Sequence, residues 1–513
     1  MFGINVFGLF RFHLALLTIS IATFSAAQGA GVDFRDFWGP RYRAQPQTDA
    51  PAKHAKQHPN APVGWVRHWN EMAINASGLD HTPVALGESR IFGEQLGPAR
   101  SSRAMAIVHI AIFDALNAIV GGYQSYTGIA PSRGEASLQA AIAQAAHDTL
   151  VALFPSQAAT FDALLAADLA TIPNSRPKAN GIDVGHRAAV AILTMRANDG
   201  SQHTEPRVGI EFTTSDEPGK WRQDPISQLP LALGGLWNEV KPLVMNTADQ
   251  FRAPPPPALT SPAYATAFVE AKRLGGDSIN TPTERTTEQT EIGIYWAYDG
   301  TPSLCAPPRL YNQIAVQIAE QMSANHVELA RLLALVNVAM ADAAIAIWES
   351  KYFYQFWRPV TGIRESDVGT GPTGAGDGNG ATTGDVTFSP LGAPASNFNG
   401  PNFTPPFPAY PSGHAGFGGA LFQVLRSFFG TDNIPFIFVS DEMNGVTRDY
   451  HGNVRPLRPR SFTSLSQAEE ENGQSRIYLG IHWVFDKTEG IAQGRRVADY
   501  VLENIFIPKH KPH

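Results

Sequence analysis

Two basic residues seven positions apart mark the first segment of the chain that could do chemistry. Lys351 and Arg358 would lie about two turns apart on one face of a helix that Pro359 ends. Two cations on one face repel each other unless negative charge lies between them, and Glu349 is the only acidic residue close by. The predicted partner is therefore an anion from outside the chain. The alternative is a solvated basic face, which the aromatic residues around the pair disfavour.

The second segment joins a helix-capping serine, a glycine and a histidine. Ser412 is a favourable capping residue, and a helix is predicted over residues 416–429. Gly413 lets the backbone approach a ligand closely, and the free N–H groups of a helix start favour an oxyanion. His414 could donate or accept a proton at that site. The alternative is an ordinary capped helix with a surface histidine.

A histidine and an aspartate four residues apart define the third segment. His482 and Asp486 would be neighbours on one helical face, so the carboxylate would hold one imidazole nitrogen and leave the other free as a ligand or nucleophile. Arg476 lies six residues before His482 and would not share that face in a straight helix. Either its side chain reaches round or the helix starts later. A purely structural His–Asp pair is the alternative.

Helical periodicity dominates the elements that must position these segments. Apolar residues recur every three or four positions along several stretches, whereas the alternation typical of strands is scarce. Residues 309–323 and 327–348 predict a helical hairpin, and further helices are predicted over 101–120, 136–154 and 491–506. The expected fold class is mainly α, with two packed helical bundles and long loops rich in glycine and proline.

The amino terminus predicts a signal peptide over residues 1–27. Arg11 precedes an apolar run over residues 14–24, and small residues follow it. The run is shorter than the roughly 20 residues of a membrane span, so a secreted or periplasmic protein without stable membrane insertion is expected. A membrane anchor or a wrongly assigned start is the alternative. No later stretch is expected to be long and uncharged enough to span a bilayer.

Proline and glycine divide the rest of the chain. The four prolines at 254–257 predict a stiff connector between an amino-terminal helical region, residues 28–257, and a carboxy-terminal domain, residues 258–513, that holds all three segments. The glycine-rich stretch 369–384 should form an exposed loop.

The overall composition excludes several classes of protein. The 513 residues carry 39 Lys and Arg against 46 Asp and Glu, a formal net charge of −7, so no global basic footprint for nucleic acid is present. Hydrophobic residues make up 43%, which excludes a wholly disordered chain. Cys305 is the only cysteine, which excludes disulfides within the chain, cysteine-based zinc clusters and iron–sulfur centres. The composition does not predict an oligomeric state.

In their order and spacing, the three segments resemble the signature shared by vanadium-dependent haloperoxidases and the type-2 phosphatidic acid phosphatase superfamily, which includes bacterial acid phosphatases. The closer resemblance is to the vanadium chloroperoxidases, because neighbouring stretches of sequence match: YWAYDG at 295–300, RLYNQ at 309–313 and PPFPAYPSGHAGFGGA at 405–420. The resemblance covers residues 295–486, with weaker similarity at 101–120. The chain lacks the extension that follows the last motif in fungal chloroperoxidases, so oligomerisation and outer loops are expected to differ.

The resemblance implies a pocket that binds one vanadate per chain. His482 would bind vanadium axially, and His414 would be the acid–base group. Asp299 would pair with Arg476 and fix its orientation. Cationic and hydrogen-bonding groups would surround the vanadate oxygens: Lys351, Arg358, Arg476, Ser412 and the Gly413 N–H. Planar guanidinium groups suit a multiply charged oxyanion, and phosphate has a similar shape and charge.

Two activities fit these residues. A haloperoxidase would use hydrogen peroxide to oxidise a halide, chloride or bromide, to hypohalous acid, which halogenates a small organic acceptor. An acid phosphatase would instead form a phosphohistidine on His482 while His414 protonates the leaving alcohol. Trp348 and Phe407 favour the haloperoxidase, since an aromatic pair lines the halide side at the matching positions of chloroperoxidases. The alternative is that both are simply core aromatics.

Other classes of enzyme lack residues that they require. His326 and Glu328 match part of a deaminase zinc motif, but the cysteine pair is missing. The chain contains neither a G-x-S-x-G elbow nor a haem-attachment motif. A helical scaffold that has lost activity is a further alternative, and it disagrees with a motif set in which every position is filled.

Overall fold

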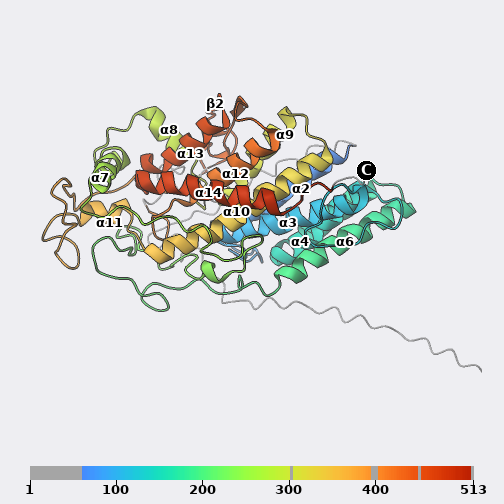
Figure 1. The fold of residues 1–513 in the computed structure, drawn as a ribbon, viewed down its shortest axis with the longest axis horizontal. Helices are drawn as coiled ribbons and strands as arrows, with labels where there is room; N and C mark the ends of the chain where they lie inside the picture. The colour runs from blue at the N-terminus through green and yellow to red at the C-terminus, as the bar shows by residue number, and fades with distance from the viewer. Residues whose placement is uncertain (1–60, 301–303, 394–402, 449–451, 510–513) are drawn as a thin grey trace, which may run out of the picture.

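The computed structural model describes residues 61–300, 304–393, 403–448 and 452–509. These residues are mainly helical, which confirms the predicted fold class, and the predicted signal peptide lies outside them. The helices of the amino-terminal region are α2 (Pro62–Asp80), α3 (Gly97–Val120), α4 (Leu138–Leu153), α5 (Ala158–Ala170) and α6 (Arg176–Arg196) (Figure 1).

The carboxy-terminal region supplies the remaining α-helices of the described chain. They are α7 (Pro262–Gly275), α8 (Thr287–Tyr295), α9 (Pro308–Gln321), α10 (His326–Tyr354), α11 (Pro359–Arg364), α12 (Gly413–Phe429), α13 (Leu465–Tyr478) and α14 (Val484–Asn504). Two three-residue strands, β1 (Phe436–Phe438) and β2 (Arg460–Phe462), pair antiparallel with Phe436 opposite Phe462. In the described residues, short 3-10 turns occur at Pro155–Gln157, Trp237–Glu239 and Asp441–Met443.

Helix α10 runs through the centre of the molecule (Figure 1). Asn325 caps it by accepting from the N–H groups of Val327 and Glu328, and Glu328 completes a capping box. Most of its side chains are buried all round, as expected of a helix that is apolar on every face. With α9 it forms the predicted hairpin, and it continues six residues beyond the predicted end at Trp348, which brings Lys351 into its last turn.

One hydrophobic core spans both regions of the chain, because α10 packs against α3 as well as against α12 and α14. The predicted boundary after residue 257 stays a prediction. Helices α3 and α10 are also long and apolar enough to cross a membrane, so the expectation that no later stretch has this composition is wrong. In the structure, 83% of the most apolar stretch of α3 and 94% of that of α10 are buried inside the protein, because the two helices pack against each other and against further helices.

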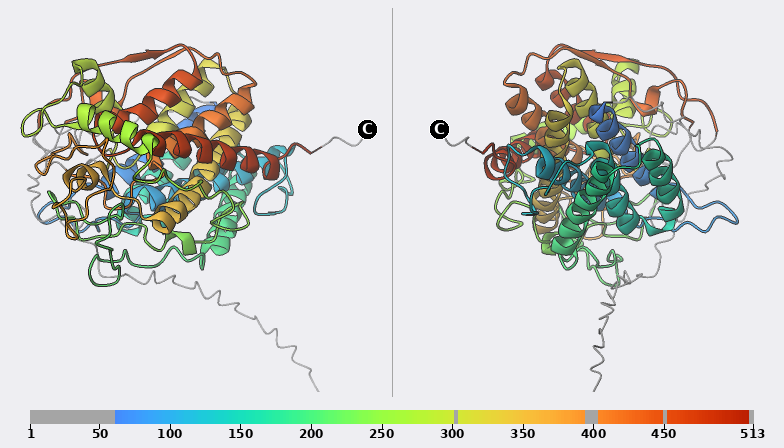
Figure 2. Two further views of the ribbon diagram at one scale, coloured as in Figure 1. Left: turned by 60° about the vertical axis from the view of Figure 1, so that its left-hand side comes forward. Right: turned by 90° about the vertical axis from the view of Figure 1, so that its right-hand side faces the viewer.

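Glycines bring α12 and α14 into close contact (Figure 2). A Cβ atom at Gly490 would lie closer than 3.0 Å to the Ser412 carbonyl oxygen, and one at Gly494 would overlap the Gly416 carbonyl. A glycine inside a helix costs up to about 1 kcal/mol of helix stability relative to alanine. Here it lets the two backbones touch, which fixes the start of α12 against α14.

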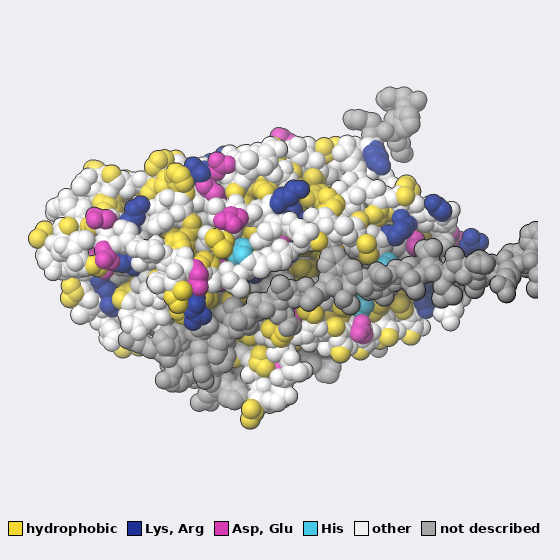
Figure 3. Space-filling view, turned by 90° about the horizontal axis from the view of Figure 1, so that it is seen from below, with side chains coloured by type: hydrophobic (Ala, Val, Ile, Leu, Met, Phe, Trp, Pro, Cys, Tyr) yellow, Lys and Arg dark blue, Asp and Glu magenta, His cyan; other side chains and the backbone are white. Residues whose placement is uncertain are grey.

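The loops follow the proline and glycine content. Residues 254–257 lie in a stretch with neither helix nor strand, and the same holds for residues 369–384. On the face seen in Figure 3, acidic and basic side chains are interspersed wherever the described residues are visible. A cavity lined by residues from α3, α10, α12 and α13, among others, contains several of the predicted site residues.

Candidate functional site

Lys351 lies at the carboxy-terminal end of α10 and is fully buried. Its Nζ donates hydrogen bonds to the carbonyl oxygens of Pro408 (2.8 Å) and Ala409 (2.9 Å). The prediction that Lys351 and Arg358 share one helical face is wrong. The chain leaves the helix at Gln355, which adopts the left-handed conformation (φ 52°), and Pro359 starts α11 rather than ending α10. Proline suits the first helical position because no intrahelical partner is needed for its nitrogen there.

Arg358 is nevertheless brought close to the third segment. Its Nε donates to the Phe407 carbonyl (3.0 Å) and its Nη1 to the Ile481 carbonyl (2.9 Å). Nη1 also lies 3.0 Å from Nε2 of His482. The remaining nitrogen, Nη2, is buried and has no hydrogen-bond partner among the residues that the structure describes.

The start of α12 has the predicted cap, although the helix begins three residues earlier than expected. Ser412 is the capping residue and its Oγ accepts from the Ala415 N–H (3.4 Å). His414 lies in the first turn, and its Nε2 is 2.5 Å from the Ala297 carbonyl oxygen and 3.8 Å from Asp299. A carbonyl can only accept, so Nε2 carries the proton in this arrangement.

Two residues that the sequence analysis did not select hold the His414 backbone. The Tyr311 hydroxyl (2.9 Å) and the Asn472 side-chain amide (3.0 Å) both donate to the His414 carbonyl oxygen. Tyr311 lies within the matching sequence stretch at residues 309–313, and this match could have pointed to it. Asn472 lies one helical turn before Arg476 on α13, and it had no comparable signal.

Arg476 occupies the last turn of α13, and its Nη2 donates to both carboxylate oxygens of Asp299 at 2.7 Å. This is the pairing that the resemblance implies. The Nε and Nη1 atoms of Arg476 are buried, and no described residue gives either of them a hydrogen-bond partner. Arg476 and His482 therefore come from different elements, because α13 ends at Tyr478 and α14 begins at Val484.

His482 precedes α14, so the prediction that His482 and Asp486 share a helical face is wrong, although the two side chains do meet. Asp486 is the third residue of α14, and its Oδ2 accepts from the Trp483 N–H (3.0 Å), a contact that satisfies a free donor at the helix start. The same oxygen lies 2.8 Å from Nδ1 of His482. A carboxylate accepts, so Nδ1 carries the proton and Nε2 presents its lone pair.

Burial and mutual repulsion lower the pKa values of the basic groups. Burial takes the pKa of Lys351 well below its usual 10.5, and the charge of Arg358 adds to the effect. Burial lowers the pKa of Arg358 to about 9. Burial, then Arg358 and Lys351, bring the pKa of His482 well below 6.5, and burial with Arg476 does the same for His414. Both imidazoles are therefore neutral near pH 7, and the cluster would be stabilised by an added anion.

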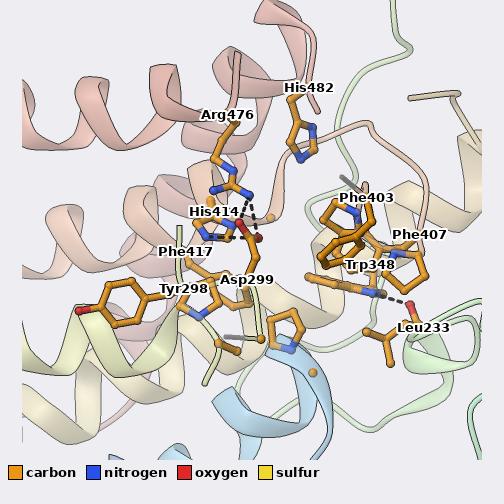
Figure 4. Close-up of a pocket in the computed structure, with 18 residues that line it drawn as sticks. Leu233, Tyr298, Asp299, Trp348, Phe403, Phe407, His414, Phe417, Arg476 and His482 are labelled. Carbon is orange, nitrogen blue, oxygen red and sulfur yellow. Dashed lines mark hydrogen bonds and ion pairs between the residues drawn. The ribbon is translucent and has the colours of Figure 1, made fainter. Parts of the chain in front are cut away.

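A cavity lies between part of this cluster and an aromatic wall (Figure 4). Of the predicted anion-site residues, His414, Arg476, His482 and Gly413 line it, whereas Lys351, Arg358 and Ser412 are not among its lining residues. Trp348 and Phe407, the predicted halide pair, both line it, with ring centroids 4.9 Å apart. Lys351 Nζ lies 5.1 Å from the centre of the Phe407 ring. The amino-terminal region also contributes wall residues that the sequence analysis missed, because nothing local in their sequence marks them: Gly97, Pro98 and Leu233.

The donor set fits a tetrahedral oxyanion such as vanadate or phosphate. Within the described part of the chain, four buried guanidinium nitrogens lack partners, and three of them belong to the predicted site: one on Arg358 and two on Arg476. Arg476 and the two imidazoles line the same cavity, and Nε2 of His482 has a lone pair to offer a metal. Buried polar groups are nearly always satisfied, so these unpaired N–H groups, two of them on a residue that lines the cavity, point to a bound acceptor.

Comparisons with known proteins show the family to which the chain belongs. A family model described as the VCPO second helical-bundle domain matches residues 331–506. Vanadium chloroperoxidase of Curvularia inaequalis is 30% identical to the chain, over 83% of this chain and 79% of that protein. The chain belongs to the vanadium-dependent haloperoxidase family.

Two solved structures of this family share the fold. A bacterial vanadium-dependent iodoperoxidase matches with a TM-score of 0.69 and 23% identity, over 89% of this chain and 100% of the other. A holo-type bacterial vanadium-dependent chloroperoxidase matches with a TM-score of 0.59 and 17% identity, over 84% of this chain and 95% of the other. The haloperoxidase fold therefore extends over both regions of the chain.

Proposed function

We propose that the chain is a vanadium-dependent haloperoxidase that oxidises chloride or bromide with hydrogen peroxide, using one vanadate bound between α10, α12 and α13. Its membership of the family supports the enzyme class and the cofactor, and it does not favour the acid phosphatase alternative. The observation that carries the assignment to this site is the set of unpaired guanidinium nitrogens on Arg358 and Arg476 beside Nε2 of His482, whose lone pair accepts from Nη1 of Arg358 in this structure.

The residues divide the work between holding the anion and moving a proton. Lys351, Arg358 and Arg476 would neutralise the vanadate oxygens, and Ser412 with the Gly413 N–H would add hydrogen bonds at the start of α12. His482 would supply the nitrogen ligand, while Asp486 fixes its tautomer. Bound vanadate would supply a Lewis acid that activates hydrogen peroxide without a change of metal oxidation state.

His414 is the group that we assign to proton transfer. It is neutral near pH 7, so it can take up a proton when peroxide binds and return it later. The aromatic wall of Trp348 and Phe407 would remove water from the halide, which makes the halide easier to oxidise. Hypohalous acid formed there would leave the cavity and halogenate a small organic acceptor.

The direct test is turnover by the purified full chain. Protein incubated with orthovanadate, hydrogen peroxide and chloride or bromide should halogenate monochlorodimedone. His482→Ala should abolish vanadate binding, whereas His414→Ala should retain binding and lose most halide oxidation. No turnover with vanadate, together with brisk hydrolysis of p-nitrophenyl phosphate, would overturn the proposal in favour of the phosphatase.

We also propose export, on the composition of the amino terminus. Arg11, the apolar run at 14–24 and the small residues before position 28 support cleavage after residue 27. Amino-terminal sequencing of protein collected outside the cytoplasm should begin near residue 28. Intact protein that keeps residues 1–27 in the cytoplasmic fraction would contradict export.

A further inference from the structure

We propose that a loop of the amino-terminal region, Leu233 with Gly234, determines halide specificity by fixing the indole of Trp348. The inference rests on the proposed haloperoxidase function, because it concerns the aromatic wall of that site. Leu233 itself lines the cavity beside Trp348 (Figure 4). The two residues act as positioning residues, since the halide would meet the indole rather than the Leu233–Gly234 backbone.

The backbone of Leu233 makes hydrogen bonds on both sides of the aromatic wall, to Trp348 and to the residue before Phe407. Its carbonyl oxygen accepts from Nε1 of Trp348 (3.0 Å) and from the hydroxyl of Tyr352 one turn further along α10 (2.9 Å). Its N–H donates to the carbonyl oxygen of Pro406, the residue before Phe407 (2.9 Å). A shift of this one residue would therefore move both aromatic rings relative to each other.

Gly234 leaves no room for the indole to move toward the loop. Its backbone is in the left-handed region (φ +75°), and a Cβ atom there would lie closer than 3.0 Å to Cδ1 and Nε1 of Trp348. The opposite edge of the indole faces Gly413, where a Cβ atom would lie 3.3 Å from the ring. The indole thus fills the gap between two glycines, one from each region of the chain.

The loop is anchored from the amino-terminal region. The Gly234 N–H donates to Oε2 of Glu205 (2.5 Å), and Oε1 of Glu205 accepts from Nε of Arg100 (3.0 Å). Both charged side chains are largely buried, which makes the pair geometrically well defined. Arg100 belongs to α3, whose first residues Gly97 and Pro98 line the same cavity. The wall residues from the amino-terminal region are therefore connected to one another, because Glu205 joins the Leu233–Gly234 loop to α3.

The position of the indole edge decides how much water and which halide the pocket admits. Chloride is smaller and more strongly hydrated than bromide or iodide, and it is harder to oxidise. A displacement of the indole by about 1 Å would loosen the apolar wall and affect the smallest halide most, since misplacement on this scale alters reactivity by up to about 100-fold. Iodide, which needs the least dehydration, would be affected least.

The test compares two glycine substitutions that share a left-handed backbone. Gly234→Ala pushes on the indole, whereas Gly209→Ala has a similar φ of +81° and no atom within 4 Å of the new Cβ. We expect Gly234→Ala to lower, by about tenfold or more, the ratio of kcat/KM for the smallest halide that the wild type oxidises to kcat/KM for iodide. Gly209→Ala should keep the wild-type ratio. Orthovanadate affinity, measured by calorimetry, should stay within about twofold in both variants.

A second variant covers the case in which Gly234→Ala fails to fold. Tyr352→Phe removes one hydrogen bond from the Leu233 carbonyl without touching the cavity wall, and it should lower the same ratio in the same direction by a smaller factor. It should also speed deuterium exchange at the Trp348 indole N–H, assigned by its loss in Trp348→Phe. Unchanged ratios in both folded variants, or in Tyr352→Phe alone if the other does not fold, would overturn the inference. A wild-type protein that oxidises no halide would instead overturn the proposed function.

Discussion

Replacement of Arg476 by lysine separates charge from hydrogen-bonding geometry in the proposed oxyanion site. The guanidinium uses Nη2 for Asp299 and leaves Nε and Nη1 free toward the cavity. Lysine keeps the positive charge but cannot hold Asp299 and also offer two directed donors. A hydrogen bond to a charged group contributes about 1.5–3 kcal/mol, and two of them about 3–6 kcal/mol. Since about 1.4 kcal/mol is tenfold in affinity, Arg476→Lys should weaken oxyanion binding by about 100-fold or more.

The assay is titration calorimetry of the full chain with orthovanadate and, separately, with inorganic phosphate. Arg309→Lys is a matched control, because Arg309 is also buried and paired with an aspartate, Asp441 (2.9 Å), while its Nη1 donates to the Ile74 carbonyl (3.0 Å). Arg309→Lys should bind both anions like the wild type even if it is less stable. Equal losses of affinity in the two variants, or wild-type affinity in Arg476→Lys, would refute the reasoning.

Two further predictions concern the contact between Asp486 and His482 and the contacts of His147 with two aspartates. Asp486→Asn should weaken orthovanadate binding by about 10–100-fold in calorimetry, because His482 loses the carboxylate that fixes its tautomer and raises its basicity; wild-type affinity would contradict this. His147 lies between Asp148 (2.8 Å) and Asp162 (2.9 Å), and although burial lowers the pKa of His147, these hydrogen bonds outweigh it and raise the pKa above 6.5. The resulting stability is present in full below pH 6.5 and is lost as the pH rises through the raised pKa. In urea unfolding, the free energy of unfolding of the wild type should fall between about pH 6 and pH 9. His147→Gln should make this fall smaller by roughly 1 kcal/mol, and an unchanged fall would exclude this role.

Features that depend on residues close together in the chain could be predicted from the sequence. The serine cap at Ser412 and the helical hairpin of α9 and α10 follow from capping chemistry and apolar spacing, and the structure has both. The helical geometry predicted for Lys351 with Arg358 was wrong, because spacing alone does not show where a helix ends. Gln355 in the left-handed region breaks the predicted helix between the two residues.

The predicted contact between His482 and Asp486 is present, although the two residues do not lie in one helix as expected. A spacing of four residues brings two side chains together within a helix and also across a helix start, where the later residue caps the first turn. The walls from the amino-terminal region could not be predicted in this way. Leu233 reaches Trp348 through a backbone carbonyl, and any residue type could supply that acceptor.

The most direct measurement of the central claim is a crystal structure of the protein soaked with orthovanadate, with anomalous data that locate vanadium. We expect one vanadium per chain bonded to Nε2 of His482, with its oxygens about 3 Å from Nη2 of Arg358 and from Nε and Nη1 of Arg476. Vanadium found elsewhere, or an empty cavity at saturating orthovanadate with the guanidinium nitrogens still unpaired, would contradict it.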